Sequence, residues 1–267
     1  MRSVFSPDIT SGLEGDAVPA GSAFITEMFS GIQGEGPYVG VRQVFVRLGG
    51  CDLRCWWCDT PGSLVRRGAG RIEVAPSTRE FIDVDNPMSL YEAEELLGRL
   101  RPQQHDSVTF TGGEPLLQPE VVLHLARSSH AFGTRTWLET HGGRVHELAE
   151  VLGEIDVVSM DIKVESSAGE WIPLEIHRSF LELAAQKDVY AKLVVPPATR
   201  DDEVIAAARM VSDVDPDIVL VLQPVTPIGR IKSSPAPARM LELQAECLVV
   251  HPSTRVIPQT HKSMGQL

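Results

Sequence analysis

Short apolar runs alternate with amphipathic helical patterns along most of the chain. The runs are too short for helices and are rich in Val, Ile and Phe, which is typical of buried strands. They predict strands at Ala23–Phe29, Gln43–Leu48, Ser107–Phe110, Arg135–Glu139, Val157–Met160, Ala191–Val195, Ile218–Gln223 and Arg255–Ile257.

The segments between the predicted strands have the apolar period of helices. One of them begins with a capping box, in which Ser89 is followed three residues later by Glu92. Thr199 and Asp202 give the same signal further along the chain, and Pro119 suits the first turn of a helix. We predict helices at Ser89–Leu100, Pro119–Arg127, Arg144–Leu152, Leu174–Gln186, Thr199–Val211 and Ala236–Leu248.

This alternation of strands and helices predicts a parallel sheet with helical crossovers. A closed barrel of eight strand–helix units would need nearly all of the 267 residues, because such barrels run to about 250 residues. About six units fit better. The expected fold class is therefore α/β, an incomplete (β/α)6-type TIM-like barrel.

Local composition predicts how the chain divides into domains. Residues 1–22 are rich in Ser, Gly, Asp and Pro and are expected to form a flexible N-terminal tail. Residues 23–267 are expected to form one domain. Within it, residues 61–87 have little periodicity and many Gly, Arg and Asp residues, which predicts a long insertion. Long loops of this kind are often lids or binding loops.

The overall composition, with 43% hydrophobic and 22% charged residues, is that of a globular protein with a sizeable core. The net charge is −12 and no basic run is longer than Arg66-Arg67, which argues against a nucleic-acid-binding surface. No apolar run approaches the roughly 18 residues of a membrane span, and the N-terminus lacks the apolar region of a signal peptide. We therefore expect a cytoplasmic protein that contacts neither nucleic acid nor membranes.

Three of the four cysteines, Cys51, Cys55 and Cys58, lie within eight positions. Their thiolates can converge on one metal site from a single loop. Zinc usually takes four ligands in paired spacing, and the remaining Cys247 is far away in the sequence, although a structural zinc loop stays possible. An iron–sulfur cube held by three thiolates leaves one iron open for chemistry. Cys247 follows Glu246 on an apolar helical stretch and is expected to be a buried, unreactive thiol.

Two further motifs follow predicted strands. T-G-G-E-P begins at Thr111, where two glycines allow close backbone approach to a ligand and Glu114 offers a carboxylate to an ammonium group. E-T-H-G begins at Glu139. Polar residues at the carboxyl ends of barrel strands face the active site. For His141 in the second motif, a capping or solvated histidine is the expected role rather than a catalytic one.

The C-x-x-x-C-x-x-C spacing with G-G-E-P and E-T-x-G resembles the radical S-adenosylmethionine (SAM) superfamily. The resemblance implies a [4Fe-4S] cluster on the three cysteines. It further implies that the amino and carboxyl groups of SAM chelate the open iron, and that cleavage of SAM yields a 5′-deoxyadenosyl radical. By the same resemblance, the residues that bind SAM are Thr111, Gly112, Gly113, Glu114, Glu139, Ser159 and Lys163.

A second set of motifs narrows the family. These are Q-G-E-G from Gln33, R-x-G-G-C from Arg47, C-D-T from Cys58 and P-Q-T-H-K from Pro258. Together they resemble the 7-carboxy-7-deazaguanine synthases, and the match runs from about Phe24 to Lys262. The resemblance implies that 6-carboxy-5,6,7,8-tetrahydropterin is converted to 7-carboxy-7-deazaguanine with loss of ammonia. This reaction belongs to 7-deazapurine and queuosine biosynthesis, and SAM is regenerated in it.

The same resemblance implies roles for individual residues. Gln33 and Glu35 would hold the pterin, Arg47 would pair with its carboxylate, and His261 would close the pocket from the C-terminal segment. Glu35, Arg47 and His261 are the expected catalytic residues. Thr60 would ligate Mg²⁺ through its hydroxyl, with waters and substrate oxygens completing the shell. The expected partners are the pterin, an electron donor such as flavodoxin or ferredoxin, and a second copy of the chain.

Two alternatives remain at this stage. The S-M-D-I-K sequence from Ser159 to Lys163 also resembles glycyl-radical-enzyme activating enzymes, which share the cysteines and G-G-E. Such an enzyme would not need Q-G-E-G or the terminal Q-T-H-K. A non-catalytic iron–sulfur or zinc protein is the second alternative, and it leaves G-G-E-P and E-T-H-G unexplained.

Overall fold

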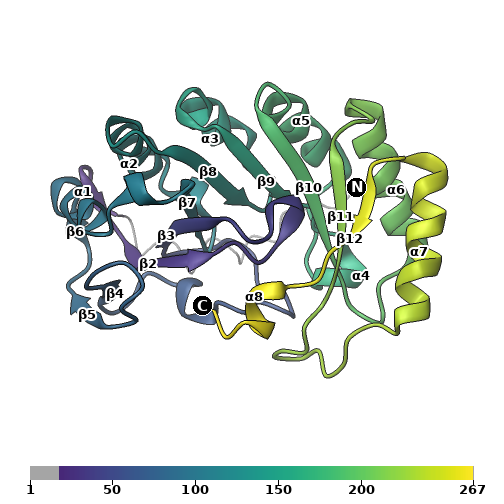
Figure 1. Cartoon of the computed structure of the whole chain (residues 1–267). Helices are drawn as coiled ribbons and strands as arrows, with labels where there is room; N and C mark the ends of the chain where they lie inside the picture. The colour runs from purple at the N-terminus through teal and green to yellow at the C-terminus, as the bar shows by residue number, and fades with distance from the viewer. Residues whose placement is uncertain (1–17, 267) are drawn as a thin grey trace.

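The structure is a computed structural model and describes residues 18–266. A ten-stranded sheet, in the order β12-β11-β10-β9-β8-β7-β3-β2-β4-β5, curves around a central space (Figure 1). Its strands are β2 (Ile25–Ile32), β3 (Arg42–Leu48), β4 (Gly70–Glu73), β5 (Phe81–Val84), β7 (Ser107–Gly112), β8 (Arg135–Thr140), β9 (Val157–Asp161), β10 (Asp188–Val195), β11 (Val219–Pro224) and β12 (Thr254–Val256). A separate two-stranded sheet pairs β1 (Ser22–Ala23) with β6 (Met88–Ser89).

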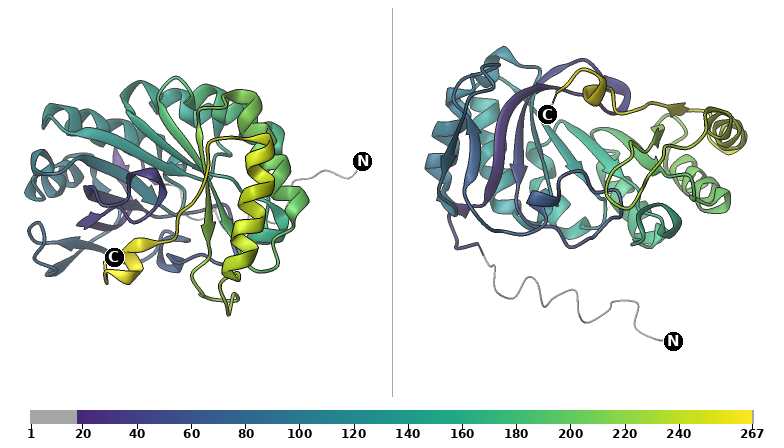
Figure 2. Two further views of the ribbon diagram at one scale, coloured as in Figure 1. Left: turned by 45° about the vertical axis from the view of Figure 1, so that its right-hand side comes forward. Right: turned by 90° about the horizontal axis from the view of Figure 1, so that it is seen from below.

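Strands β3 and β7 to β12 run parallel, and helices connect them outside the sheet (Figures 1 and 2). The helices are α1 (Leu90–Arg99), α2 (Pro119–Ala131), α3 (Val145–Val151), α4 (Glu165–Ala168), α5 (Leu174–Ala184), α6 (Asp201–Val214), α7 (Pro237–Val250) and α8 (Thr260–Ser263). The sheet does not close, because β12 and β5 are its two edges. The incomplete barrel expected from the sequence is confirmed.

The main core lies between the sheet and the outer helices, where parallel strands and helices bury their apolar faces together. A smaller cluster lies on the inner face and consists of Trp137, Val157, Tyr190 and Val221. Tyr38, from the β2–β3 connection, packs edge-on against the Trp137 ring at 5.0 Å. This aromatic cluster fills the amino-terminal half of the barrel, so the central space opens toward the carboxyl ends of the strands.

The predicted strands all occur, with bounds that shift by a few residues. The predicted N-cap at Ser89 is confirmed, since its Oγ accepts the Glu92 backbone N–H at 3.2 Å; the reciprocal bond to the Glu92 side chain that completes a capping box is not found among the described residues. The predicted cap at Thr199 is wrong: α6 begins after Arg200, which takes the N-cap position with extended backbone. No helix within residues 18–266 has the length and apolar character needed to cross a membrane.

The structure adds detail to the expected tail and to the expected insertion. Most of the expected tail, residues 1–17, lies outside the described residues. Residues 21 and 22 are anchored, because Ser22 pairs with Ser89 in β1–β6 and Gly21 accepts a backbone hydrogen bond from Leu90 at 3.2 Å. The insertion at 61–87 is not a loop throughout: β4 and β5 form a hairpin that extends the sheet beside β2.

Candidate active site

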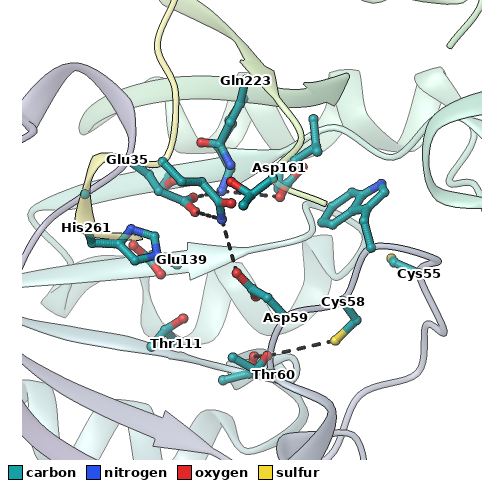
Figure 3. A pocket seen from close by; sticks show the side chains of 18 of the residues that line it. Glu35, Cys55, Cys58, Asp59, Thr60, Thr111, Glu139, Asp161, Gln223 and His261 are labelled. Carbon is teal, nitrogen blue, oxygen red and sulfur yellow. Dashed lines mark hydrogen bonds and ion pairs between the residues drawn. The ribbon is translucent and has the colours of Figure 1, made fainter. Parts of the chain in front are cut away.

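A cavity of about 570 Å³ opens at the carboxyl ends of the parallel strands. The cluster loop, which we define as residues 49–60, and the loops after β7, β8 and β11 line it, together with the β2–β3 connection and the C-terminal segment. Figure 3 shows Glu35 and His261 on one side of the cavity and Cys55 and Cys58 on another, with Asp59 between them.

Strand alternation explains which polar side chains enter the cavity. Side chains two residues apart along a strand face the same way. Trp137, Val157, Tyr190 and Val221 face inward, so the residues two positions further on also face inward, now at the cavity. These residues are Glu139, Ser159, Lys192 and Gln223, and all four line the cavity.

The three cysteines of the cluster loop line the cavity and are free thiols. Burial raises the pKa of the Cys51 thiol to about 12 and also raises that of Cys55. The protein alone therefore does not favour thiolates here, and a bound metal would have to supply the stabilising positive charge. Thr60 lies beside them, with its Oγ1 3.9 Å from the Cys58 sulfur and 3.4 Å from the Gly112 carbonyl oxygen.

A row of mostly buried charged side chains, linked by ion pairs, lies in the cavity wall. Lys192 is ion-paired with Glu35 and lies 3.5 Å from a carboxylate oxygen of Asp161. Lys163 pairs with the same Asp161 oxygen at 3.1 Å and stacks over the Trp57 ring at 4.1 Å. Burial alone would raise the pKa of Glu35, but Lys192 outweighs it and holds the pKa at about 2. The other Asp161 oxygen, Oδ1, is buried and has no partner among the described residues.

Gln33 lies beside Glu35 and Glu139 and is only 2% exposed. Its amide nitrogen donates to Glu139 at 2.9 Å and to Gln43 at 3.1 Å. Its amide oxygen accepts the Glu35 backbone N–H at 3.0 Å. Gln33 therefore fixes the Q-G-E-G loop and the Glu139 side chain, while still lining the cavity.

Arg47 lines the cavity from β3, and only part of its guanidinium group is bonded within the protein. Its Nε donates to Glu27 at 3.0 Å, and Glu27 also pairs with Arg71 at 3.1 Å. Within the described part of the chain, the two terminal nitrogens of Arg47 have no hydrogen-bond partner. They remain able to bind an anion.

The C-terminal segment lies across the Q-G-E-G loop (Figures 1 and 2). Thr260 donates its backbone N–H to the Gly34 carbonyl at 2.9 Å. Gln259 bridges Glu35, at 2.7 Å, and Asp59, at 3.1 Å. The segment therefore joins the β2–β3 connection to the cluster loop.

Potential metal-ligating atoms of Glu35, Asp59 and His261 lie within 4.8 Å of one another. Lys192 neutralises Glu35, and Lys262 pairs with Asp59 at 3.0 Å. Because both carboxylates already have cationic partners, this trio does not require a metal ion.

Glu114 does not reach the cavity, in contrast to the expectation that its carboxylate binds an amino group. It is 0% exposed. Its Oε1 accepts from the Leu116 backbone and from the Thr140 hydroxyl, and its Oε2 accepts the His141 backbone N–H at 2.9 Å. A saturated, buried carboxylate orients its neighbours rather than a ligand.

His141 is buried as well, 7% exposed, so it is not solvated. Its Nδ1 accepts the Gly143 backbone N–H at 3.1 Å, which is the kind of contact expected of a capping histidine. Its Nε2 contacts Asp52 Oδ1 at 2.8 Å, and Asp52 Oδ2 pairs with Arg144 at 2.8 Å. Both carboxylates near the ring, Glu114 and Asp52, outweigh burial and raise the pKa of His141.

The sequence interpretation gave no individual role to several residues that line the cavity: Asp59, Asp161, Lys192, Gln223 and Gln259. Gln223 is 1% exposed, and its Oε1 has no partner among residues 18–266, so it is free for a ligand. Its position two residues after an inward Val221 was a usable signal. Gln259 and Asp59 meet only through the fold, because 200 residues separate them.

The turn after β7 needs glycine at Gly113, because an added Cβ would lie 2.1 Å from the Gly50 carbonyl oxygen and 2.7 Å from that of Ser63. Both obstacles are backbone atoms and cannot rotate away. We expect Gly113→Ala to lower the free energy of unfolding by about 1–3 kcal/mol, measured by thermal denaturation. Gly62→Ala is the matched control, since a Cβ there meets nothing within 4 Å. Equal stability of the two variants would contradict the prediction.

Comparisons with known proteins place the chain among relatives of similar length. Residues 45–219 match the model of the radical SAM superfamily. The 7-carboxy-7-deazaguanine synthase of Geobacter sulfurreducens is 39% identical over 92% of this chain and 98% of that protein. The synthase of Methanocaldococcus jannaschii is 33% identical over 91% of this chain and 100% of that protein. The crystal structure of QueE from Escherichia coli aligns with a TM-score of 0.58 at 22% identity, covering 89% of this chain and 94% of that one.

Proposed function

The chain belongs to the radical SAM superfamily and, within it, to the 7-carboxy-7-deazaguanine synthases, and from this premise we propose which residues carry out the reaction. The enzyme is a carbon–nitrogen lyase that uses a [4Fe-4S] cluster, SAM and Mg²⁺. It converts 6-carboxy-5,6,7,8-tetrahydropterin to 7-carboxy-7-deazaguanine with loss of ammonia. The assignments below concern this chain's own side chains.

Cys51, Cys55 and Cys58 hold the cluster. Their fit rests on three free thiols that line one cavity from one loop. A cube bound by three thiolates keeps one iron open for SAM. When bound, the cluster and SAM supply a carbon-centred radical that abstracts a hydrogen atom from the substrate.

SAM binds along the carboxyl ends of β7, β8 and β9. The backbone of Gly112 and Gly113 offers a surface that no side chain covers, and Thr111 lies beside it. Glu139, Ser159 and Lys163 supply polar contacts from the cavity wall. Glu114 contributes indirectly, since its carboxylate fixes Thr140 and His141.

The pterin binds opposite the cluster. Glu35 stays ionised near neutral pH because Lys192 lowers its pKa, so it accepts hydrogen bonds from the ring's N–H groups. Gln33 holds the Glu35 loop, and His261 covers the ring from the C-terminal segment. Arg47 pairs with the substrate carboxylate through its terminal nitrogens. Thr60 offers its hydroxyl to Mg²⁺ at the edge of the cluster loop.

The observation that carries this proposal is the convergence of two sets of residues on one cavity. The cysteines lie on one side, Glu35 and His261 lie on the other (Figure 3), and Arg47 and the G-G-E loop line the same cavity from the neighbouring strands β3 and β7. The test is anaerobic reconstitution of the cluster, followed by addition of reductant, SAM, Mg²⁺ and the carboxytetrahydropterin. Carboxydeazaguanine detected by mass supports the proposal. Deoxyadenosine without any deazaguanine would refute the substrate and leave the radical chemistry intact.

An activating enzyme for a glycyl-radical protein is not favoured. Such an enzyme must admit a loop of its protein substrate to the radical. Here the C-terminal segment crosses the cavity and is tied to both Gly34 and Asp59. A non-catalytic metal protein is excluded by the family to which the chain belongs.

Arg47→Ala is expected to raise the KM for the pterin about tenfold or more, because a charge-assisted hydrogen bond contributes about 1.5–3 kcal/mol. Its iron content should match that of the wild type. Arg71→Ala is the control, since Arg71 shares Glu27 but does not line the cavity. Loss of iron in Arg47→Ala, or an equal KM change in both variants, would contradict the assigned role.

The enzyme needs a reductant for its cluster, and we propose an electron-donor protein such as flavodoxin or ferredoxin. We further propose that the protein acts in the cytoplasm and forms a homodimer. Sedimentation of the reconstituted enzyme measures the oligomeric state directly, and a monomer would contradict the dimer.

A further inference from the structure

The residue after each cysteine of the cluster loop is tied to a different part of the barrel. After the first cysteine, Asp52 reaches the segment that follows β8. After the second, Trp56 donates its backbone N–H to Ala168 in α4 at 2.9 Å. After the third, Asp59 pairs with Lys262 in the C-terminal segment at 3.0 Å. These three contacts are among those that set the loop's position.

The Asp52 contact is buried and charge-assisted. Its Oδ1 accepts from His141 Nε2 and its Oδ2 accepts from Arg144 Nη2, each at 2.8 Å. Within residues 18–266, no other member of positions 51–60 is hydrogen-bonded or ion-paired to the segment after β8. This one carboxylate therefore joins the two loops.

His141 extends the connection to a third loop. Its backbone N–H donates to Glu114 Oε2 at 2.9 Å, and the neighbouring Thr140 hydroxyl donates to Glu114 Oε1 at 2.8 Å. The Glu114 backbone N–H donates to the Gly50 carbonyl at 2.8 Å, which returns the network to the cluster loop. The result is a closed ring of contacts around the first cysteine.

We propose that Asp52 and His141 are positioning residues that hold Cys51 in register with the loops that bind SAM. In this role they act through the cysteine and not on the substrate. Residues 49–60 contain no regular helix or strand. Backbone hydrogen bonds anchor Gly50, Cys51 and Trp56 to other segments, but among the described residues only the Asp52 side chain joins the loop to the segment after β8. Polar groups behind a metal ligand orient it, and their removal costs roughly 10–100-fold in affinity or activity. The proposal rests on the cluster and SAM, not on the identity of the pterin.

The test uses the anaerobically reconstituted enzyme without pterin. In Asp52→Ala and His141→Ala, iron content should stay near that of the wild type. The SAM concentration at which half of the reduced clusters show the EPR spectrum of the SAM-bound form should rise about tenfold or more. His141→Gln, whose amide nitrogen can still donate to Asp52, should recover most of this loss. Because both residues act in one contact, the double alanine variant should resemble Asp52→Ala rather than multiply the two effects.

The matched control is His130→Ala. His130 also lies between two carboxylates, Glu154 at 3.2 Å and Asp156 at 3.0 Å, but on the outer side of the barrel. Its removal should leave the EPR response to SAM unchanged. An unchanged response in His141→Gln and His141→Ala alike, or multiplied effects in the double variant, would overturn the proposal. Failure to form deazaguanine would not bear on it, since no pterin is present.

Discussion

Cys55→Ala is expected to abolish both deoxyadenosine and carboxydeazaguanine formation. The remaining two thiolates, Cys51 and Cys58, cannot hold a cube that needs three. Without an iron that binds SAM, no radical forms and the reaction returns to its uncatalysed rate. We expect iron and acid-labile sulfide to fall to background after anaerobic reconstitution, measured together with both products by mass.

The fourth cysteine provides the control. Cys247 is 0% exposed in α7, and burial raises the pKa of its thiol to about 11, so it is an inert core residue. Cys247→Ala should retain full iron content and activity and lose only a little stability. A Cys55→Ala variant that still makes deoxyadenosine would refute the assignment of the three cysteines. Loss of iron in Cys247→Ala would refute it as well.

The sequence predicted the barrel well because each strand and helix is specified locally. Apolar period, capping boxes and glycine turns act within about ten residues, and the strands from β7 to β11 follow them. The hairpin of β4 and β5 escaped prediction for a physical reason. Each strand has four residues with an Arg or Asp among them. β4 buries the charged Glu73 together with Ile72, and Ile82 in β5 is 43% exposed, so no apolar pattern in the sequence marks them.

The site residues also divide into those that the sequence reveals and those that only the fold reveals. The cysteines and the glycines at 112 and 113 are recognisable because their spacing along the chain is itself the signal. The partners of Glu35 and Asp52 are not, since Lys192 is 157 residues from the first and His141 is 89 residues from the second. Glu114 was misread because its motif gives no information about which way the carboxylate turns. Only the folded chain shows that the carboxylate points away from the cavity and into the protein interior.

The ion pair of Glu35 and Lys192 shows how strongly such distant contacts matter. Lys192→Met is expected to lower the free energy of unfolding by about 3–5 kcal/mol, because removing one partner leaves the other charge buried. Asp161 would keep Lys163 at 3.1 Å, so Glu35 bears most of the loss. Chemical denaturation of the apo protein measures the effect.

The stability of Lys192→Met should depend on pH in a different way from that of the wild type. In the wild type the pKa of Glu35 is about 2 against an ordinary 4.5. The pair's contribution is therefore complete above about pH 4.5 and disappears as the pH falls through about 2. Without Lys192, burial dominates and raises the pKa of Glu35. The variant should then lose stability as the pH rises from about 4.5 toward neutrality. In the wild type, the ion pair causes no loss of stability over this pH range.

The double variant Glu35→Gln with Lys192→Met separates charge from shape. It removes both charges and leaves side chains of similar size, so it should recover most of the stability lost in Lys192→Met. Its activity should remain low, because the amide cannot replace the carboxylate that we propose accepts the pterin's N–H groups. A double variant no more stable than Lys192→Met would contradict the buried-charge explanation. A Lys192→Met variant as stable as the wild type at pH 7 would contradict the ion pair itself.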